Sequence, residues 1–339
     1  MKKEIRKVLI VRLSSIGDIV ILTPIFRSIK EKFPYARIHY LIKKEFYPIV
    51  QDNPYVDRFW LYDVREGFRG WVRICRELAS EDYDLLIDMH NVLRTWILSL
   101  ILFKAIQLRY YKPRLFRFLL FYFYINLFPP DYSLLKEYYN VLKPLGINYN
   151  GQKPEIFLNE KIVDKAKNEL RNIGLNGPFA TILPIANWKN KRYSLEKYAI
   201  LAERITREYN LSVLWLGGKN DIYLKELPIR DKNSNYLYLS QDMALSLGIL
   251  SLSNLVIGND TGLTYAAEAI GVPTILILGP TSCETGAGLY TDHGITIEKR
   301  LWCRPCSQRG NRKCYRKKQY CLEIEPDEIF KSVKKLIKM

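Results

Sequence analysis

Short apolar runs alternate along the first half of the chain with segments whose apolar residues recur at helical spacing. The run KVLIVR at 7–12 predicts a buried strand, and the segment 19–33 has the period of a helix. The same alternation continues with strands predicted at 38–42, 59–62 and 84–89, and with helices at 71–79, 91–103 and 132–142. Strands and helices in this order predict a parallel, doubly wound sheet.

The second half begins the alternation again after the polar segment 146–154 (GINYNGQKP), which glycine and proline interrupt. Its strands are predicted at 179–183, 211–216, 236–239, 255–257 and 274–278, and its helices at 161–172, 194–209, 244–251, 263–270 and 326–338. Because domain boundaries fall in polar, flexible segments, we predict two doubly wound domains, 1–150 and 151–339. The second would carry a cysteine-rich lobe at 300–322 and close with its last helix.

The stretch 254–280 predicts a strand, a helix of small residues and a second strand joined as one unit. Asp260, Thr261 and Gly262 form its first turn, at the carboxyl end of a strand, where open α/β sheets bind ligands. Free backbone N–H groups at the start of the helix suit a phosphate group. The alternative is an ordinary turn in which Asp260 caps the helix.

A second turn of small residues, SSIGD at 14–18, follows the first strand. It is neither G-x-G-x-x-G nor a P-loop, so a dinucleotide or ATPase fingerprint is missing. Asp18 stands at the start of the next helix, where its carboxylate can cap the helix. The same position lets Asp18 take a proton from an attacking hydroxyl group.

The loop PIANWKNKRY at 184–193 carries three cations at the carboxyl end of a strand, among them Lys191. Such cations can neutralise a diphosphate leaving group without a metal ion, although a solvated basic loop would look the same. His90 and Arg94 follow a strand of the first half. They are placed to touch a ligand or to serve a structural role.

The chain has 52 Lys and Arg residues against 35 Asp and Glu residues, a formal net charge of +17. Such a charge points to nucleic acid, an anionic membrane surface or a phosphorylated substrate. The segment 96–128 is aromatic and basic, and it is typical either of a membrane-surface segment or of a buried helix pair with basic edges. No apolar run reaches the length of roughly 18–20 residues that a membrane span needs, and no signal peptide is evident, so we expect a cytoplasmic protein.

The late cysteines Cys303, Cys306, Cys314 and Cys321 begin with a C-x2-C pair and have the form of a four-cysteine metal site. Their basic neighbours would favour thiolates. The alternative is a set of reduced thiols in a basic lobe. We therefore expect at most a structural zinc or iron ion there.

In their order and spacing, these motifs resemble glycosyltransferase family nine, the ADP-heptose–lipopolysaccharide heptosyltransferases, over nearly the whole chain. The matching segments are Ser14–Asp18 with Thr23-Pro24, Trp188 with Lys191 and Tyr193, Asp260–Leu263, Gly279–Thr281, and the cysteines with Cys321-Leu322. The resemblance implies the GT-B fold, two Rossmann-like domains facing a central cleft, the first binding the acceptor and the second the nucleotide sugar.

The resemblance also implies an inverting, metal-independent transfer of a heptose from ADP-heptose to the Kdo or heptose of the lipopolysaccharide inner core. Asp18 would be the general base, with Ser15, Gly17 and Arg94 on the acceptor side. The donor would be bound by Lys191, Asp260, Thr261, Gly262, Asp242 and Met243. The partners would be the ADP-sugar, a lipid A–Kdo acceptor and the anionic inner face of the cytoplasmic membrane, with the enzyme peripheral to it and no nucleic acid bound.

The sequence departs from the family pattern at Tyr265, where many relatives have a histidine, and at Lys219, where some have a carboxylate. These departures leave the donor sugar open. Two alternatives remain at this point: a basic nucleic-acid-binding protein with a four-cysteine metal lobe, and a non-catalytic protein of the same fold.

Overall fold

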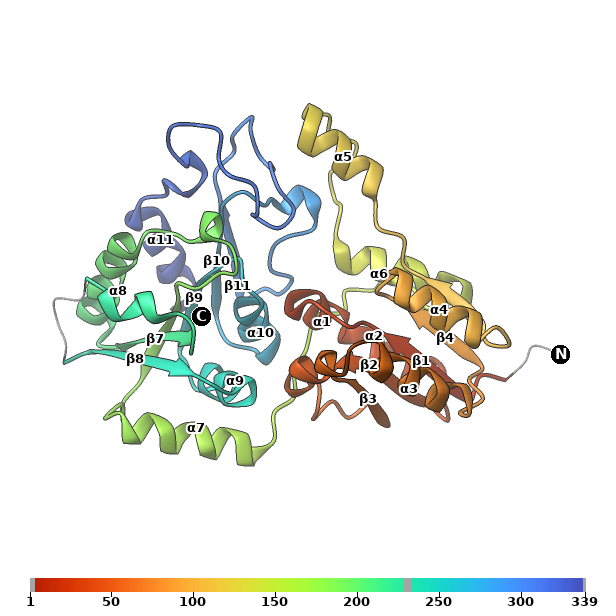
Figure 1. Cartoon of the computed structure of the whole chain (residues 1–339). Helices are drawn as coiled ribbons and strands as arrows, with labels where there is room; N and C mark the ends of the chain where they lie inside the picture. The colour runs from red at the N-terminus through yellow and green to blue at the C-terminus, as the bar shows by residue number, and fades with distance from the viewer. Residues whose placement is uncertain (1–3, 229–232, 338–339) are drawn as a thin grey trace. The chain divides into compact units, whose positions relative to one another are not determined.

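The computed structural model of the chain describes residues 4–228 and 233–337, and it divides into two compact units. The first unit runs to Pro113 and resumes over Leu134–Phe157, whereas the second comprises Arg114–Ser133 and the chain from Leu158 onward. The segment Arg114–Ser133 thus belongs with the second half of the sequence, a grouping that the sequence pattern did not indicate. Each unit is built on a parallel sheet (Figure 1).

The sheet of the first unit has the strand order β3-β2-β1-β4-β5, and each neighbouring pair is parallel. Its strands are β1 (Lys7–Val11), β2 (Arg37–Lys43), β3 (Arg58–Tyr62), β4 (Leu85–Asp88) and β5 (Ile106–Arg109). Val8 to Val11 are fully buried because helices cover both faces of β1, which explains the continuous apolar run. The chain leaves β1 toward β3 and returns through β4 toward β5, so the order reverses between β1 and β4.

The helices of the first unit are α1 (Ile16–Leu22), α2 (Pro24–Lys32), α3 (Gly67–Ala79), α4 (Leu93–Ile101) and α6 (Leu134–Leu142). The single helix predicted at 19–33 is two helices, because Pro24 lacks the N–H group that would continue α1 and instead opens α2. Apolar residues of α3 and α4, including Trp71 and Leu98, pack with Leu9 and Val11 on one face of the sheet.

The sheet of the second unit has the order β11-β10-β9-β6-β7-β8, again with parallel neighbours. Its strands are β6 (Phe179–Leu183), β7 (Ser212–Gly218), β8 (Asn235–Ser240), β9 (Leu255–Asn259), β10 (Thr274–Leu278) and β11 (Gly294–Glu298). From β6 the chain builds outward to β8, and from β9 it builds outward to β11, so this order reverses between β6 and β9. Both sheets confirm the predicted doubly wound α/β architecture.

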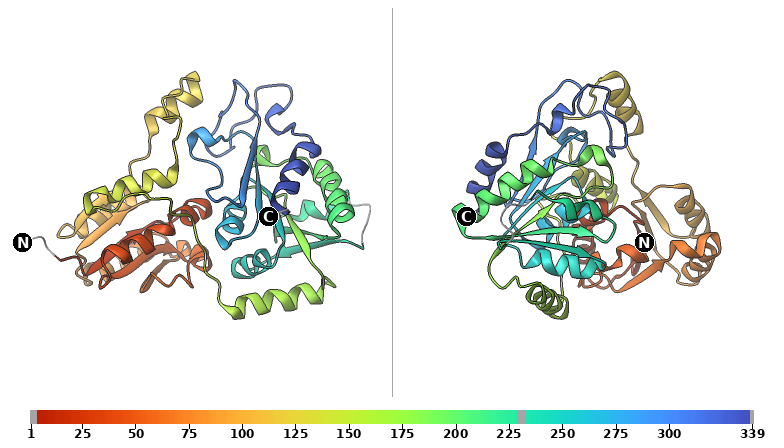
Figure 2. Two further views of the ribbon diagram at one scale, coloured as in Figure 1. Left: turned by 180° about the vertical axis from the view of Figure 1, so that it is seen from behind. Right: turned by 60° about the vertical axis from the view of Figure 1, so that its left-hand side comes forward.

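The helices of the second unit are α5 (Arg114–Phe123), α7 (Glu160–Asn172), α8 (Leu195–Tyr209), α9 (Met243–Ser251), α10 (Gly262–Ile270) and α11 (Pro326–Ile337). Tyr198 of α8 and Phe330 of α11 belong to one core with Trp215 of β7, while α7 and α10 each pack against α9 (Figures 1 and 2). The closing helix was predicted to reach 338, a residue that lies outside the described part of the chain.

Two strands were not predicted, β5 and β11. Both are edge strands, and Ile106 and Gln107 of β5 are exposed, so neither strand shows the buried apolar run that marks the central strands. The segment 96–128 is not a buried helix pair, since it contains part of α4, strand β5 and the largely exposed helix α5.

Candidate active site

Polar side chains meet in the first unit where β1 and β4 end. Arg12 directly follows β1, Asp18 lies in the first turn of α1, and the Arg12 Nη2 atom is 2.6 Å from Asp18 Oδ2. Because β1 and β4 are the strands between which the sheet order reverses, this is the place where doubly wound sheets bind ligands.

Asp18 is held from three sides. The backbone N–H and the hydroxyl of Ser15 both donate to Asp18 Oδ2, at 3.2 and 2.8 Å, and the Tyr138 hydroxyl donates to Oδ1 at 3.3 Å. Burial by itself would raise the pKa of Asp18, but the Arg12 guanidinium and the Ser15 hydrogen bonds outweigh it and lower the pKa to about 2. The side chain keeps 29 % of its surface exposed, so the carboxylate is ionised and still reachable.

His90 lies close to the same cluster, immediately after β4. Its backbone N–H donates to Asp88 Oδ1 at 3.0 Å, and its carbonyl accepts from Lys112 Nζ at 2.8 Å. Burial and the nearby charges of Arg12 and Lys112 lower the pKa of His90 to about 3, so the imidazole is neutral at pH 7. Its Nδ1 atom is buried and finds no hydrogen-bond partner within residues 4–228 and 233–337.

Of the predicted acceptor-side residues, Ser15 and Gly17 lie at this cluster, with Ser15 at the N-cap of α1 and Gly17 inside the helix. Arg94 takes a different direction in the described structure. Its Nη1 atom donates to the Tyr62 hydroxyl at 3.2 Å, and its guanidinium lies over the Tyr62 ring. The structure therefore brings Ser15 and Gly17 to Asp18 but shows Arg94 bonded to β3.

We expect Arg12→Met to raise the pKa of Asp18, which NMR titration of its carboxyl carbon measures. With the cation gone, burial raises the pKa of Asp18 from about 2, so the carboxylate is protonated over a wider acid range. The titration profile of Asp18 in the wild type should show no protonation above about pH 4, whereas in the variant the carboxylate should become protonated as the pH falls below about 6.

The matched control is Arg65→Met, which breaks a surface ion pair with Asp63 and should leave the profile unchanged. The lowered pKa of Asp18 also predicts how the stability of the fold depends on pH. Because the folded-state pKa lies below the ordinary value of 3.8, ionised Asp18 stabilises the fold above about pH 4, and this contribution is lost as the pH falls toward 2. Superimposable profiles for wild type and Arg12→Met would contradict the coupling.

The second unit carries its own polar cluster where β6 and β9 end. Lys191, in the short turn Lys189–Lys191 after β6, places its Nζ atom 2.6 Å from Asp260 Oδ2, and both side chains are nearly buried. Asp260 directly follows β9, the strand beside β6 in the sheet. These are again the strands between which the order reverses, so the sheet presents a cation and a carboxylate at its expected ligand-binding edge.

Asp260 does not cap α10, which corrects the capping interpretation. The N-cap residue is Thr261, while the Asp260 carboxylate accepts from the Thr281 hydroxyl at 2.8 Å and from the Tyr265 hydroxyl at 3.3 Å. The Tyr265 hydroxyl thus orients Asp260 and also accepts from the Gly288 N–H. Thr261 and Gly262 open α10 beside this pair, with the positive end of the helix dipole at the site.

Asn259 ties the two sides of this cluster together. Fully buried at the end of β9, it accepts at Oδ1 from the Tyr193 N–H and from the Tyr198 hydroxyl, both at 3.0 Å. Tyr193 begins the segment after Lys191 and Arg192, so the amide fixes the strand that carries Asp260 to the loop that carries Lys191.

We expect Asn259→Ala to destabilise the fold by about 2–4 kcal/mol, because it leaves two buried donors without an acceptor. Tyr198→Phe removes only one of these donors and should cost about 1 kcal/mol. Urea unfolding followed by circular dichroism measures both. A cost for Asn259→Ala no larger than that of Tyr198→Phe would contradict the bridging role.

The predicted residues Asp242 and Met243 lie on the same edge of this sheet but after β8, at its far end from β9. Asp242 caps α9 by accepting from the Ala244 N–H at 2.9 Å, and it pairs with Lys165 at 3.1 Å. The structure therefore does not bring Asp242 into contact with the Lys191–Asp260 pair.

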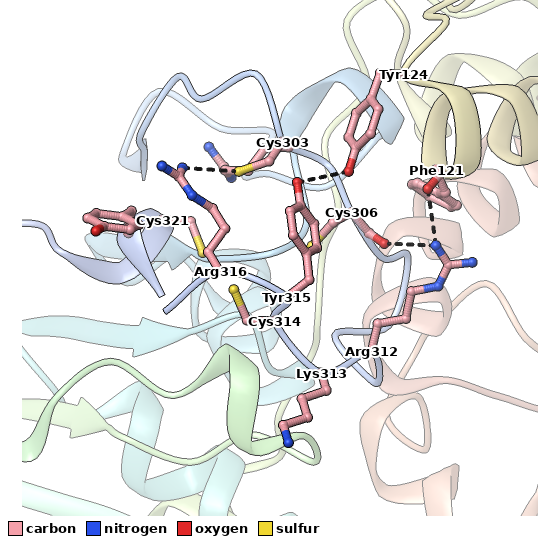
Figure 3. A pocket seen from close by; sticks show the side chains of 12 residues that line it. Phe121, Tyr124, Cys303, Cys306, Arg312, Lys313, Cys314, Tyr315, Arg316 and Cys321 are labelled. Atoms are coloured by element: carbon pink, nitrogen blue, oxygen red, sulfur yellow. Dashed lines mark hydrogen bonds between the residues drawn. The ribbon is translucent and has the colours of Figure 1, made fainter. Parts of the chain in front are cut away.

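The four late cysteines line one cavity of about 110 Å³ in the second unit (Figure 3). Phe121 and Tyr124 from the segment of α5 form part of its wall, and Arg312 donates to the Phe121 carbonyl at 3.1 Å. All four cysteines are free of disulfides. Within residues 4–228 and 233–337, however, no three His, Cys, Asp or Glu side chains are grouped closely enough to hold a metal ion.

The predicted structural metal is therefore not supported by the arrangement of these thiols, although they converge on one cavity. The predicted thiolates are also not found at two of the positions. Burial raises the pKa of Cys306 and raises that of Cys321 to about 11, which keeps both as neutral thiols at pH 7. Arg304 donates to the carbonyls of Gly279 and Thr281 and pairs with Glu298, and its charge lowers the pKa of both thiols by less than burial raises it.

Comparison with known proteins decides the family. Residues 71–316 match the model of glycosyltransferase family 9 (heptosyltransferase), which is well over half of the chain. The chain belongs to glycosyltransferase family 9. It is 24 % identical to lipopolysaccharide heptosyltransferase 1 of Campylobacter coli, an alignment that covers 97 % of this chain and 98 % of that protein.

Solved structures of the family share the fold. A family 9 glycosyltransferase from Veillonella parvula superposes with a TM-score of 0.81 at 20 % identity, covering 100 % of this chain and 99 % of that chain. The Escherichia coli heptosyltransferase WaaC with ADP-2-deoxy-2-fluoro heptose gives 0.68 at 16 % identity, covering 97 % and 99 %. The predicted GT-B fold is confirmed, and this family 9 protein is an enzyme of the glycosyltransferase class.

Sequence reasoning missed Arg12, Tyr138 and Thr281 at the two clusters of this family 9 enzyme. Arg12 had a usable signal, since it is a charged residue that ends an otherwise apolar strand at the ligand-binding edge. Tyr138 carries no such mark, because only the packing of α6 brings it to Asp18. Thr281 stands in the matching segment Gly279–Thr281, but its contact with Asp260 depends on the loop after β10.

Proposed function

We propose that the enzyme transfers a heptose from ADP-heptose to the Kdo or heptose of the lipopolysaccharide inner core with inversion at the anomeric carbon. The observation that carries the proposal is the ionised, reachable Asp18 held by Arg12 and Ser15 at the reversal point of the first sheet. The name of the Campylobacter coli relative supports the product class, and the ligand in the WaaC structure supports the donor class.

The proposed step is a single displacement. Asp18 accepts the proton of an acceptor hydroxyl while that oxygen attacks the anomeric carbon, and the bond from this carbon to the diphosphate breaks to release ADP. Because the pKa of Asp18 is about 2, the carboxylate is always ionised at neutral pH but is a weak base, so proton transfer must lag behind attack. Such a base acts late, as the hydroxyl oxygen becomes acidic on bonding to carbon.

The diphosphate needs positive charge as it leaves, and Lys191 supplies it. In the structure without substrate, Asp260 holds the Lys191 ammonium at 2.6 Å, which fixes its position before the donor binds. The Thr261 and Gly262 N–H groups at the start of α10 would bind phosphate oxygens. Asp260 would accept from sugar hydroxyls, with Asp242 and Met243 toward the adenine. These roles need no metal ion.

On the acceptor side, we propose that Ser15 and Gly17 shape the site around Asp18 and that Arg94 turns from Tyr62 toward an acidic acceptor. The acceptor would be a lipid A–Kdo molecule, so the enzyme would work as a peripheral protein at the anionic inner face of the cytoplasmic membrane. Among the helices that the structure describes, none combines the length and the apolar character required to cross a bilayer.

The test is incubation with ADP-heptose and a Kdo–lipid A acceptor, followed by mass spectrometry of the acceptor. A gain of one heptose with release of ADP is expected. Release of ADP without a modified acceptor would overturn the assignment. Tight, salt-sensitive binding of DNA or RNA together with no transfer would favour the nucleic-acid-binding alternative instead.

A further inference from the structure

Helix α4 of the first unit buries Leu98 in the core but is also apolar on its exposed face. Its exposed positions are mostly apolar and follow helical spacing along one face: Leu93, Trp96, Ile97, Leu100 and Ile101. Leu93 and Leu100 are 78 % and 74 % exposed, and Phe103, just beyond the helix, is 72 % exposed. A surface helix ordinarily buries its apolar face, so this exposure needs a reason.

The polar face of α4 is fixed against the sheet by hydrogen bonds. Thr95 and Ser99 are buried, and the carbonyl of Ser99 accepts from Gln107 Nε2 of β5 at 2.7 Å. Arg109 of β5 donates to the Ser99 hydroxyl and pairs with the buried Asp88 at 3.1 Å. Rolling the helix to bury Leu93 and Leu100 would take Ser99 away from Gln107 and Arg109, so the apolar face is held outward.

The charged side chains of this part of the sequence are all cations. The sequence contains no Asp or Glu between Asp88 and Asp131, whereas Arg94 and Lys104 are exposed at the face itself. The Trp96 indole lies at the edge of the face, where Arg109 stacks on its ring and Asn91 accepts its N–H. Apolar side chains with an interfacial tryptophan and a rim of cations match the headgroup layer of an anionic membrane.

We propose that the outer face of α4, with Phe103 and Lys104, docks the enzyme on anionic lipid. A second copy fits this face less well, because a symmetric contact between two such faces would bring together the cations of both copies, and the sequence between Asp88 and Asp131 supplies no acidic partner for them. The proposal deepens the proposed function, since it assigns to α4 the contact with the membrane that would carry the acceptor.

The test is co-sedimentation of the full chain with phosphatidylcholine vesicles, with and without phosphatidylglycerol. Wild type is expected to bind only the anionic vesicles, and Leu100→Glu or Leu93→Glu should weaken this binding at least about tenfold. Lys104→Glu should weaken the binding less, and the binding that remains should fall less steeply with added salt than that of wild type. The matched control is Ile200→Glu on α8, where the isoleucine is 49 % exposed.

Circular dichroism checks that each variant is folded, and turnover with a delipidated acceptor sugar should be equal for wild type and Leu100→Glu. The proposal would be overturned if Leu100→Glu bound anionic vesicles as tightly as wild type does. It would also be overturned if wild type bound neutral and anionic vesicles equally. A dimer that Leu100→Glu dissociates, without vesicle binding, would identify a second copy as the occupant and overturn it too. If the protein bound the vesicles but transferred no heptose, only the proposed function would be contradicted, and the docking proposal would stand.

Discussion

Asp18→Asn is expected to lower kcat about 10³-fold while the protein stays folded and binds ADP as wild type does. The amide has nearly the shape of the carboxylate and can still accept from Ser15 and Tyr138, but it cannot take a proton from the acceptor hydroxyl. It also leaves the Arg12 guanidinium without its ionic partner. Initial rates of ADP release and calorimetric titration with ADP measure the two quantities separately.

The matched control for this change is Asp164→Asn, which makes the same replacement at an exposed ion pair with Lys167. Its kcat should equal that of wild type. If Asp18→Asn retained kcat within about threefold of wild type, the carboxylate would not be the base. A variant that lost both turnover and ADP binding would instead indicate a general loss of structure.

Lys191→Ala is expected to lower kcat/KM by roughly 10²–10³-fold, because a charge that stabilises the departing diphosphate is removed from a nearly buried position. The loss in kcat/KM should be larger than removal of one positive charge would give, because the Asp260 carboxylate then faces the donor phosphates without its cation. Lys191→Arg should recover part of the rate, because the charge returns with a different shape. Steady-state kinetics with varied ADP-heptose measures these values.

Lys189→Ala is the control for this prediction, since Lys189 is an exposed lysine of the same turn. It should change kcat/KM little. Equal losses for Lys189→Ala and Lys191→Ala would show that the loop acts only through its overall charge. An unchanged kcat/KM for Lys191→Ala would remove the proposed electrostatic role.

The central strands could be predicted because burial on both faces leaves an apolar run that the sequence displays directly, as in 179–183 and 274–278, whose predicted bounds match β6 and β10. The edge strands β5 and β11 lack this signal, which explains why they were missed, although the edge strands β3 and β8 were predicted. The membership of α5 in the second unit was also beyond the sequence. Hydrogen bonds such as those of Arg312 to Phe121 and of Tyr124 to Tyr315 join residues far apart in the chain, and no local pattern records them.

The turns at Asp18 and Asp260 could be located because strand ends and helix starts mark the ligand-binding edge of a doubly wound sheet. Their electrostatics could not be predicted, because they depend on which strands become neighbours. Arg12 is buried beside Asp18 only because β4 lies next to β1 and the Met89 carbonyl accepts from Arg12. The pairing of Asp260 with Lys191 follows in the same way from the adjacency of β6 and β9.

The assignment of Arg114–Ser133 to the second unit means that the backbone passes from one unit to the other between Pro113 and Arg114, between Ser133 and Leu134, and between Phe157 and Leu158. Protease cleavage at the last of these links alone would therefore divide the chain into two fragments, and the first would carry away Arg114–Ser133, a part of the second unit. A fragment starting at Leu158 would lack Phe121 and Tyr124, so part of the wall around the four cysteines would be missing. The second unit thus includes a segment that Leu134–Phe157, a part of the first unit, separates from the rest of it in the sequence.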